Sequence, residues 1–221
     1  MNKIKLCIFD MDGLLLDTER GIWQKHEKII IKEYGKELTD EMLLMIVGTN
    51  RKTCQKQLKI IFGDDFPAEE YYNKVSACYK DACENKKIEL MPGAVEILKY
   101  LKKNNIKIAL GTSTQRKYAT AALKNCGIFD YFDFTVCGDE VVNGKPDPEI
   151  YMKSVEHYNY KPEECIVFED SSIGAKAAYT SGINLILVPD TMKPNEVDKE
   201  KALAIVSSLQ EAISVIDKIN N

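Results

Sequence analysis

The stretch IKLCIFDMDGLLLDTE, Ile4–Glu19, decides how the rest of the chain is interpreted. Its first six residues are apolar except for Lys5, and two acids, Asp10 and Asp12, follow directly. A short apolar run of this kind is typical of a strand that is covered on both faces of a parallel sheet. Carboxylates at the end of a buried strand repel each other. The arrangement therefore requires a positive partner from elsewhere.

The composition is that of an ordinary globular protein, with 221 residues, 45% hydrophobic and 29% charged. A net charge of −4 argues against nucleic acid or an anionic membrane as the main partner. No segment approaches the roughly 20 apolar residues of a membrane span, and the N-terminus lacks the apolar region of a signal peptide. Seven cysteines without a Cys-x-x-Cys pair indicate reduced, mostly buried thiols. We expect a cytoplasmic protein, monomeric or weakly oligomeric.

Short apolar runs alternate with amphipathic segments along most of the chain. In residues 94–104, Ala94, Ile97, Leu98 and Leu101 share one helical face, and segments near 116–126, 147–158, 172–181 and 209–219 also indicate helices. The strand-like runs are Ile4–Phe9, Ile106–Leu110, Phe134–Cys137, Cys165–Phe168 and Ile183–Val188. This alternation predicts an α/β fold with a doubly wound, mostly parallel, Rossmann-like sheet.

One long segment interrupts the alternation. From about residue 20 to residue 86 the pattern predicts helices and no strand, and Pro67 suits the first turn of one of them. We expect a small helical cap domain of residues 18–87, inserted after the first strand. Residues 1–17 and 88–221 would then form the catalytic core.

Polar residues follow four of the predicted strands. They are Asp10 and Asp12, the loop Gly111–Thr114 (GTST), Lys145 in GKPDP, and the acidic pair Glu169–Asp170. Parallel strands bring their carboxyl ends to one crevice. Asp10, Asp12 and Asp170 would repel one another there, and oxygen-only ligands favour Mg²⁺ over zinc or copper. Because Lys145 adds charge and Thr112 can hold phosphate oxygens, the set points to a phosphoryl substrate.

Four ordered stretches, FDMDGLLLDTE, LGTST, GKPDPEIY and VFEDSSIGAKAA, resemble the motifs of the haloacid dehalogenase superfamily over essentially the whole chain. The chain is most similar to the branch of sugar phosphatases and β-phosphoglucomutases, whose helical cap follows the first strand. DGLLLDTER and MPGA look like the corresponding stretches of pseudouridine-5′-phosphatases and hexose-phosphate phosphatases.

The resemblance implies a role for each matching residue. Asp10 would be the nucleophile that forms an aspartyl-phosphate, and Asp12 the general acid and base. Thr112 and the backbone of Ser113 would hold the phosphoryl group, and Lys145 would neutralise its charge. The predicted Mg²⁺ ligands are Asp10, Asp12 through its carbonyl, Asp170 and, as a second acid, Glu169.

The same resemblance leaves the acceptor of the phosphoryl group open. We expect a Mg²⁺-dependent phosphatase of small phosphorylated metabolites, with a β-phosphoglucomutase-type mutase and a catalytically silent phosphate- or partner-binding protein as alternatives. The mutases usually carry a histidine where this chain has Ile22, and we interpret His26, one turn later, as a surface residue.

The segment Val47–Arg51 is our hypothesis for the specificity loop, with Gly48 allowing a turn. Arg51 matches a cap arginine that binds the far phosphate of a sugar bisphosphate in the mutases, and a solvated surface arginine is the alternative. Thr18 and Glu19 either take part in the site or simply begin the cap helix.

Overall fold

The computed structural model describes residues 2–47, 49, 51–86 and 88–220. Six strands in this part of the chain form one parallel sheet in the order β3-β2-β1-β4-β5-β6. The strands are β1 (Leu6–Phe9), β2 (Lys107–Gly111), β3 (Phe134–Val136), β4 (Cys165–Glu169), β5 (Asn184–Leu187) and β6 (Ala204–Ile205). The sheet confirms the predicted doubly wound α/β fold.

The first strand lies at the centre of the sheet. Phe9 pairs in register with Leu110 of β2 and Phe168 of β4, and the rings of Phe9 and Phe168 stack with centroids 4.6 Å apart. All four residues of β1 are fully buried, as expected for a strand covered on both faces. The residues that follow β1, β2 and β4 therefore emerge at the same edge of the sheet.

Helices cover both faces of the sheet. Cys7 and Phe9 pack in a cluster with residues of α5 (Ala94–Lys103), α6 (Arg116–Asn125) and α10 (Leu209–Asn220). Leu6 and Ile8 face the opposite side, where they pack in a cluster with residues of α7 (Glu149–Tyr158) and α8 (Ser172–Thr180). This alternation along β1 follows from the period of two in a strand.

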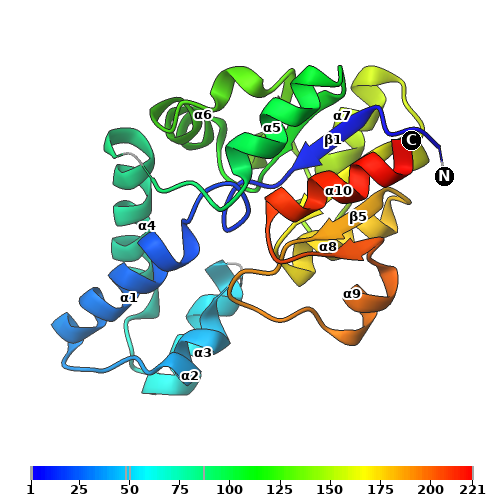
Figure 1. Ribbon diagram of the computed structural model, residues 1–221. Coiled ribbons are helices and arrows are strands. Elements are labelled where there is room, and N and C mark those ends of the chain that lie inside the picture. Colours follow the sequence, from blue (N-terminus) through cyan, green and yellow to red (C-terminus); the bar gives the residue numbers. More distant parts are fainter. Residues whose placement is uncertain (1, 48, 50, 87, 221) are drawn as a thin grey trace.

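Between about residues 20 and 86 the described part of the chain contains helices joined by short turns and no named strand, as predicted. It contains a π-helical turn (Glu19–Gln24), α1 (Lys25–Ile30), a 3₁₀ turn (Ile31–Tyr34), α2 (Asp40–Ile46), α3 (Arg51–Phe62) and α4 (Ala68–Asn85), which directly follows Pro67. These helices lie beside the sheet (Figure 1) and bury their own apolar cluster around Ile31, Leu58 and Tyr71. Their assignment as a separate cap domain of residues 18–87 stays a prediction, and residue 87 lies outside the described residues.

Apart from three single 3₁₀ turns (Phe129–Tyr131, Gly138–Glu140 and Pro162–Glu164), two short elements outside the helical segment were not predicted, α9 (Glu196–Lys201) and β6. Six of the seven cysteines are buried, in agreement with the expected mostly buried thiols, and Cys78 is half-buried. Within the part of the chain that the structure covers, no helix combines the length and apolar character needed to cross a membrane.

Candidate active site

A cavity of about 360 Å³ lies at the carboxyl ends of β1 and β4, between the sheet and the helical segment. It brings together six of the predicted site residues: Asp10, Asp12, Ser113, Lys145, Glu169 and Asp170. The helical segment contributes Glu19, Trp23, Glu27, Thr49, Tyr72 and Tyr79, among others. Of the described residues that line the cavity, Lys145 is the single lysine or arginine.

Lys145 joins the acids that follow β1 and end β4. Its ammonium group donates to Oδ1 of Asp10 at 2.5 Å and to Oε1 of Glu169 at 2.7 Å. All three side chains are at least nine-tenths buried. Burial lowers the pKa of Lys145, but the charges of Asp10 and Glu169 outweigh it and raise that pKa. Lys145 is therefore a cation at neutral pH and supplies the positive partner that Asp10 requires.

Both carboxylate oxygens of Glu169 accept hydrogen bonds. The hydroxyl of Tyr151 donates to Oε1 at 2.5 Å, while the N–H and hydroxyl of Ser171 donate to Oε2 at 3.1 and 2.9 Å. Burial raises the pKa of Glu169, but Lys145, Tyr151 and Ser171 together lower it below its ordinary value. Glu169 is thus a fixed anion. Tyr151 was not recognised from the sequence, because a tyrosine on the apolar face of a helix resembles an ordinary core residue.

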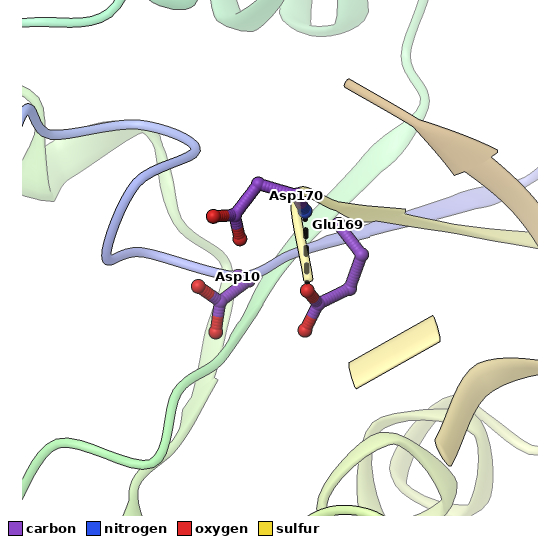
Figure 2. A group of neighbouring side chains, drawn as sticks. All are labelled: Asp10, Glu169 and Asp170. Carbon is purple, nitrogen blue, oxygen red and sulfur yellow. Dashed lines mark hydrogen bonds between the residues drawn. The ribbon is translucent and has the colours of Figure 1, made fainter. Parts of the chain in front are cut away.

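Asp170 completes an acidic group with Asp10 and Glu169, whose nearest carboxylate oxygens all lie within 4.8 Å of one another (Figure 2). Burial, followed by the charges of Glu169 and Asp10, raises the pKa of Asp170 well above its ordinary value. Gly13, at φ +81°, makes room for this carboxylate, since a Cβ there would lie 2.4 Å from Oδ2 of Asp170. Two buried carboxylates and the half-buried one of Asp170, with one lysine, form a donor set that suits a hard divalent cation.

Asp12 has different surroundings from Asp10. Its Oδ1 accepts from the hydroxyl of Tyr79 at 2.8 Å, and its Oδ2 accepts from the hydroxyl of Thr114 at 2.8 Å. Tyr79 lies on α4, so the helical segment supplies a partner of this acid. The two aspartates are therefore separated, one against Lys145 and the other against two hydroxyl groups.

The loop after β2 presents Ser113 and Thr114 to the cavity. Thr112, the predicted phosphate ligand, is fully buried behind them and is not among the cavity-lining residues that the structure describes. Its hydroxyl accepts from the N–H of Thr114 at 3.1 Å and lies 3.4 Å from Asp12. The phosphate-binding role of Thr112 stays a prediction, and Thr114 was missed.

Arg51 lies at the start of α3 and is not among the described residues that line the cavity. Its guanidinium donates to Glu69 at 2.9 Å and to Asn73 at 3.0 Å, and it lies over the ring of Tyr72. Val47 and Thr49 of the predicted specificity loop do line the cavity, whereas Gly48 lies outside the described residues. The substrate-binding role of Arg51 stays a prediction.

The turn after β1 contains the remaining sequence candidates. Glu19 lines the cavity, and burial raises its pKa to about 8 with help from the charge of Asp12. Thr18 is fully buried and does not line the cavity. Ile22 packs against the core, and the ring of His26 bonds to the carbonyl of Ile22 at 2.7 Å, so His26 is not a cavity residue either.

The parallel sheet, with acids and a lysine gathered at its carboxyl edge, is the arrangement in which open α/β enzymes place their active sites. Residues 7–188 match the family described as haloacid dehalogenase-like hydrolase, and the chain belongs to this family. It is 34% identical to the phosphorylated carbohydrates phosphatase of Thermotoga maritima, over 98% of this chain and all of that protein. A relative in Drosophila melanogaster, named probable pseudouridine-5′-phosphatase, is 32% identical over 96% of this chain and 92% of its own length.

A solved structure also matches this chain over nearly its whole length. The β-phosphoglucomutase of Clostridium difficile superposes with a TM-score of 0.72 at 25% identity, covering 99% of this chain and 97% of that one. Relatives named as phosphatases and a relative named as a mutase thus share the fold and length of this chain.

Proposed function

We propose that this hydrolase is a phosphatase of small phosphorylated metabolites, sugar phosphates or nucleotide-derived phosphates, and that it works through an aspartyl-phosphate on Asp10. The observation that supports this most strongly is the separation of Asp10 and Asp12. They are two residues apart, yet one carboxylate contacts Lys145 and the other contacts hydroxyl groups. Different surroundings are what divide two carboxylates into a nucleophile and an acid. The relatives named as phosphatases also support a phosphatase function.

In the first step a carboxylate oxygen of Asp10 attacks phosphorus and the bond from phosphorus to the leaving oxygen breaks. Asp12 gives its proton to that oxygen, so the product leaves as a neutral alcohol. Lys145 offsets the charge that gathers as an anionic carboxylate approaches an anionic phosphate. The backbone of Ser113, at the cavity wall, holds the phosphoryl oxygens in place.

In the second step water attacks the phosphorus of the aspartyl-phosphate. Asp12, now ionised, takes a proton from that water, and the bond from phosphorus to Asp10 breaks. Inorganic phosphate leaves and both acids return to their starting protonation states. Asp12 acts twice, so the hydroxyl groups of Tyr79 and Thr114 must hold it in one orientation throughout.

Mg²⁺ is the proposed cofactor because the site offers buried carboxylates in excess of its single lysine. Asp10 and Asp170 would hold the ion, which would neutralise charge on the phosphate and on both acids. The oxygens of Glu169 are already engaged by Lys145, Tyr151 and Ser171. Its contribution is therefore to fix Lys145 and the Asp170 loop, rather than to bind the ion directly.

The mutase alternative is less well supported. Ile22 stands where a mutase histidine is expected and packs into the core, while His26 is bonded to the Ile22 carbonyl outside the cavity. A catalytically silent binding protein is also disfavoured, because Asp10, Asp12, Lys145 and Asp170 are intact and meet in one cavity. Cytoplasmic location, and a monomeric or weakly oligomeric state, stay predictions from the sequence.

The deciding experiment measures phosphate release with Mg²⁺ from hexose phosphates, nucleoside 5′-phosphates, glycerol phosphate and phenyl phosphate. The proposal expects release that is abolished by Asp10→Asn, and a phosphorylated Asp10 peptide after acid quenching. Conversion of β-glucose 1-phosphate to glucose 6-phosphate with a bisphosphate primer, without net release, would establish the mutase instead. No turnover of any substrate, with unchanged ligand binding by Asp10→Asn, would leave a binding protein.

A further inference from the structure

The helical wall of the cavity carries a buried acid that the proposed mechanism does not use. Glu27 of α1 lines the cavity with only 6% of its surface exposed. Its Oε2 has no hydrogen-bond partner among the residues that the structure describes. Burial raises its pKa to about 7. A buried carboxylate oxygen without a partner is rare in folded proteins, because leaving it unpaired costs free energy.

Aromatic side chains line the same part of the cavity as Glu27. Trp23 and Tyr72 both line the cavity, with ring centroids 6.0 Å apart and planes tilted by 39°. Trp23 also stacks on Tyr79, at a centroid distance of 5.3 Å. Aromatic faces of this kind receive the flat or apolar side of a sugar ring or a base. Glu27 adds a polar group whose position can fix the orientation of that ring.

The helical wall of the cavity carries acidic side chains, whereas the sequence suggests a cation there, Arg51, for a second phosphate. The guanidinium of Arg51 is engaged by Glu69 and Asn73 outside the cavity, whereas Glu19 and Glu27 are inside. No lysine or arginine in the described part of the helical segment lines the cavity. A second phosphate placed against this wall would face carboxylates and no cation.

We propose that Glu27 binds the end of the substrate that is remote from the phosphate, and that this end carries O–H or N–H donors and no second phosphate. The inference rests on the proposed phosphatase function and deepens it. A carboxylate oxygen accepts hydrogen bonds from sugar hydroxyls, from the N–H edge of a base or from an amine. Above the pKa of Glu27 a bisphosphate is disfavoured, because its second anion would lie close to the ionised carboxylate in a partly desolvated cavity.

The test compares the wild type with Glu27→Gln and Glu27→Leu, and uses Glu41→Gln as the matched control. Glu41 is an exposed acid on α2, outside the cavity. The substrates are glucose 6-phosphate and uridine 5′-phosphate, which carry remote donors, phenyl phosphate, which carries none, and fructose 1,6-bisphosphate. The measured quantity is the ratio of kcat/KM for the better donor-bearing substrate to kcat/KM for phenyl phosphate.

We expect Glu27→Leu to lower this ratio by about 10- to 100-fold, mostly through KM, because a hydrogen bond to a charged group is lost. Glu27→Gln should lower it less, Glu41→Gln should leave it unchanged, and the wild type should prefer the monophosphates to fructose 1,6-bisphosphate. Thermal unfolding supplies an independent readout, since Glu27→Leu should melt no lower than the wild type.

Three results would overturn the inference while leaving the phosphatase intact. They are an unchanged ratio in Glu27→Leu, a wild-type preference for the bisphosphate, and a Glu27→Leu protein that melts below the wild type, which would make Glu27 structural. Failure of the wild type to hydrolyse any substrate, phenyl phosphate included, would instead refute the proposed function, and the inference with it.

Discussion

Replacing Gly174 by alanine should disrupt the site by displacing the buried carboxylate of Glu169. Gly174 lies in the first turn of α8, directly against that carboxylate. A Cβ at this position would lie 1.7 Å from Oε1 and 2.0 Å from the carboxyl carbon. Glu169 would have to retreat by roughly 2 Å to reach an ordinary contact distance. Its hydrogen bonds with Lys145 and Tyr151, at 2.7 and 2.5 Å, cannot survive such a shift.

The size of the effect follows from these two bonds. Each hydrogen bond to a charged group contributes about 1.5–3 kcal/mol, so losing both costs about 3–6 kcal/mol. The higher helix propensity of alanine relative to glycine offsets up to about 1 kcal/mol of this loss. We expect Gly174→Ala to lower the free energy of unfolding by about 2–5 kcal/mol. Without the contact to Glu169, the same substitution would be neutral or stabilising.

Urea unfolding followed by circular dichroism measures this difference. Gly144→Ala is the matched control, since a Cβ there would have no atom within 4 Å. A double-mutant cycle with Glu169→Ala isolates the cause, because Gly174→Ala should cost almost nothing once the carboxylate is absent. A loss below about 1 kcal/mol in the wild-type background, or an equal loss in both backgrounds, would refute the reasoning.

Three further perturbations test other parts of the site. Tyr79→Phe should lower kcat about 10- to 100-fold by removing a hydrogen bond to Asp12, and an equal loss in an Asp12→Asn background would show that the hydroxyl acts elsewhere. Glu27 has a folded-state pKa of about 7, raised by burial above its ordinary 4.5, so the folded protein binds more protons than the unfolded chain between these pH values. Its ionisation therefore removes stability as pH rises from about 4.5 to 7, and Glu27→Gln should match the wild type at pH 4 and exceed it by up to about 3 kcal/mol at pH 8 in urea unfolding; a constant difference across this range would contradict the raised pKa. Chelation of Mg²⁺ should abolish turnover, and Mg²⁺ should raise the melting temperature of the wild type but not of Asp170→Ala, whereas an equal rise in both would place the ion elsewhere.

The sheet could be predicted because its central strands are apolar at nearly every position. Cys165–Phe168 was predicted as a strand, and β4 spans Cys165–Glu169. The two elements that were missed lack this signal. β6 has only two residues, and α9, EVDKEK, is almost entirely polar. β6 owes its conformation to β5, with which it pairs, whereas α9 begins with a local capping box between Asn195 and Asp198.

The site was predictable where its residues follow strands, and not where they come from helices. Asp10, Lys145 and Asp170 were proposed from strand ends, and the structure places them in one cavity. Tyr79 and Tyr151 lie on helices, where an aromatic residue resembles core packing, and only the tertiary fold brings their hydroxyls to the acids. Alternation of side chains does not separate the residues of the loop GTST, because Ser113 and Thr114 are neighbours and both line the cavity. Thr112 is buried, and Thr114 reaches the cavity.

The hydroxyl of Tyr79 also limits how new variants of this enzyme could be built. The helical segment that lines the cavity is nearly continuous in sequence, so it is an obvious unit to exchange when a different substrate is wanted. Such a graft would carry away the tyrosine that holds Asp12. A transplanted helix must bring a hydroxyl to the same place. Otherwise the chimaera would bind its new substrate and release it largely unchanged.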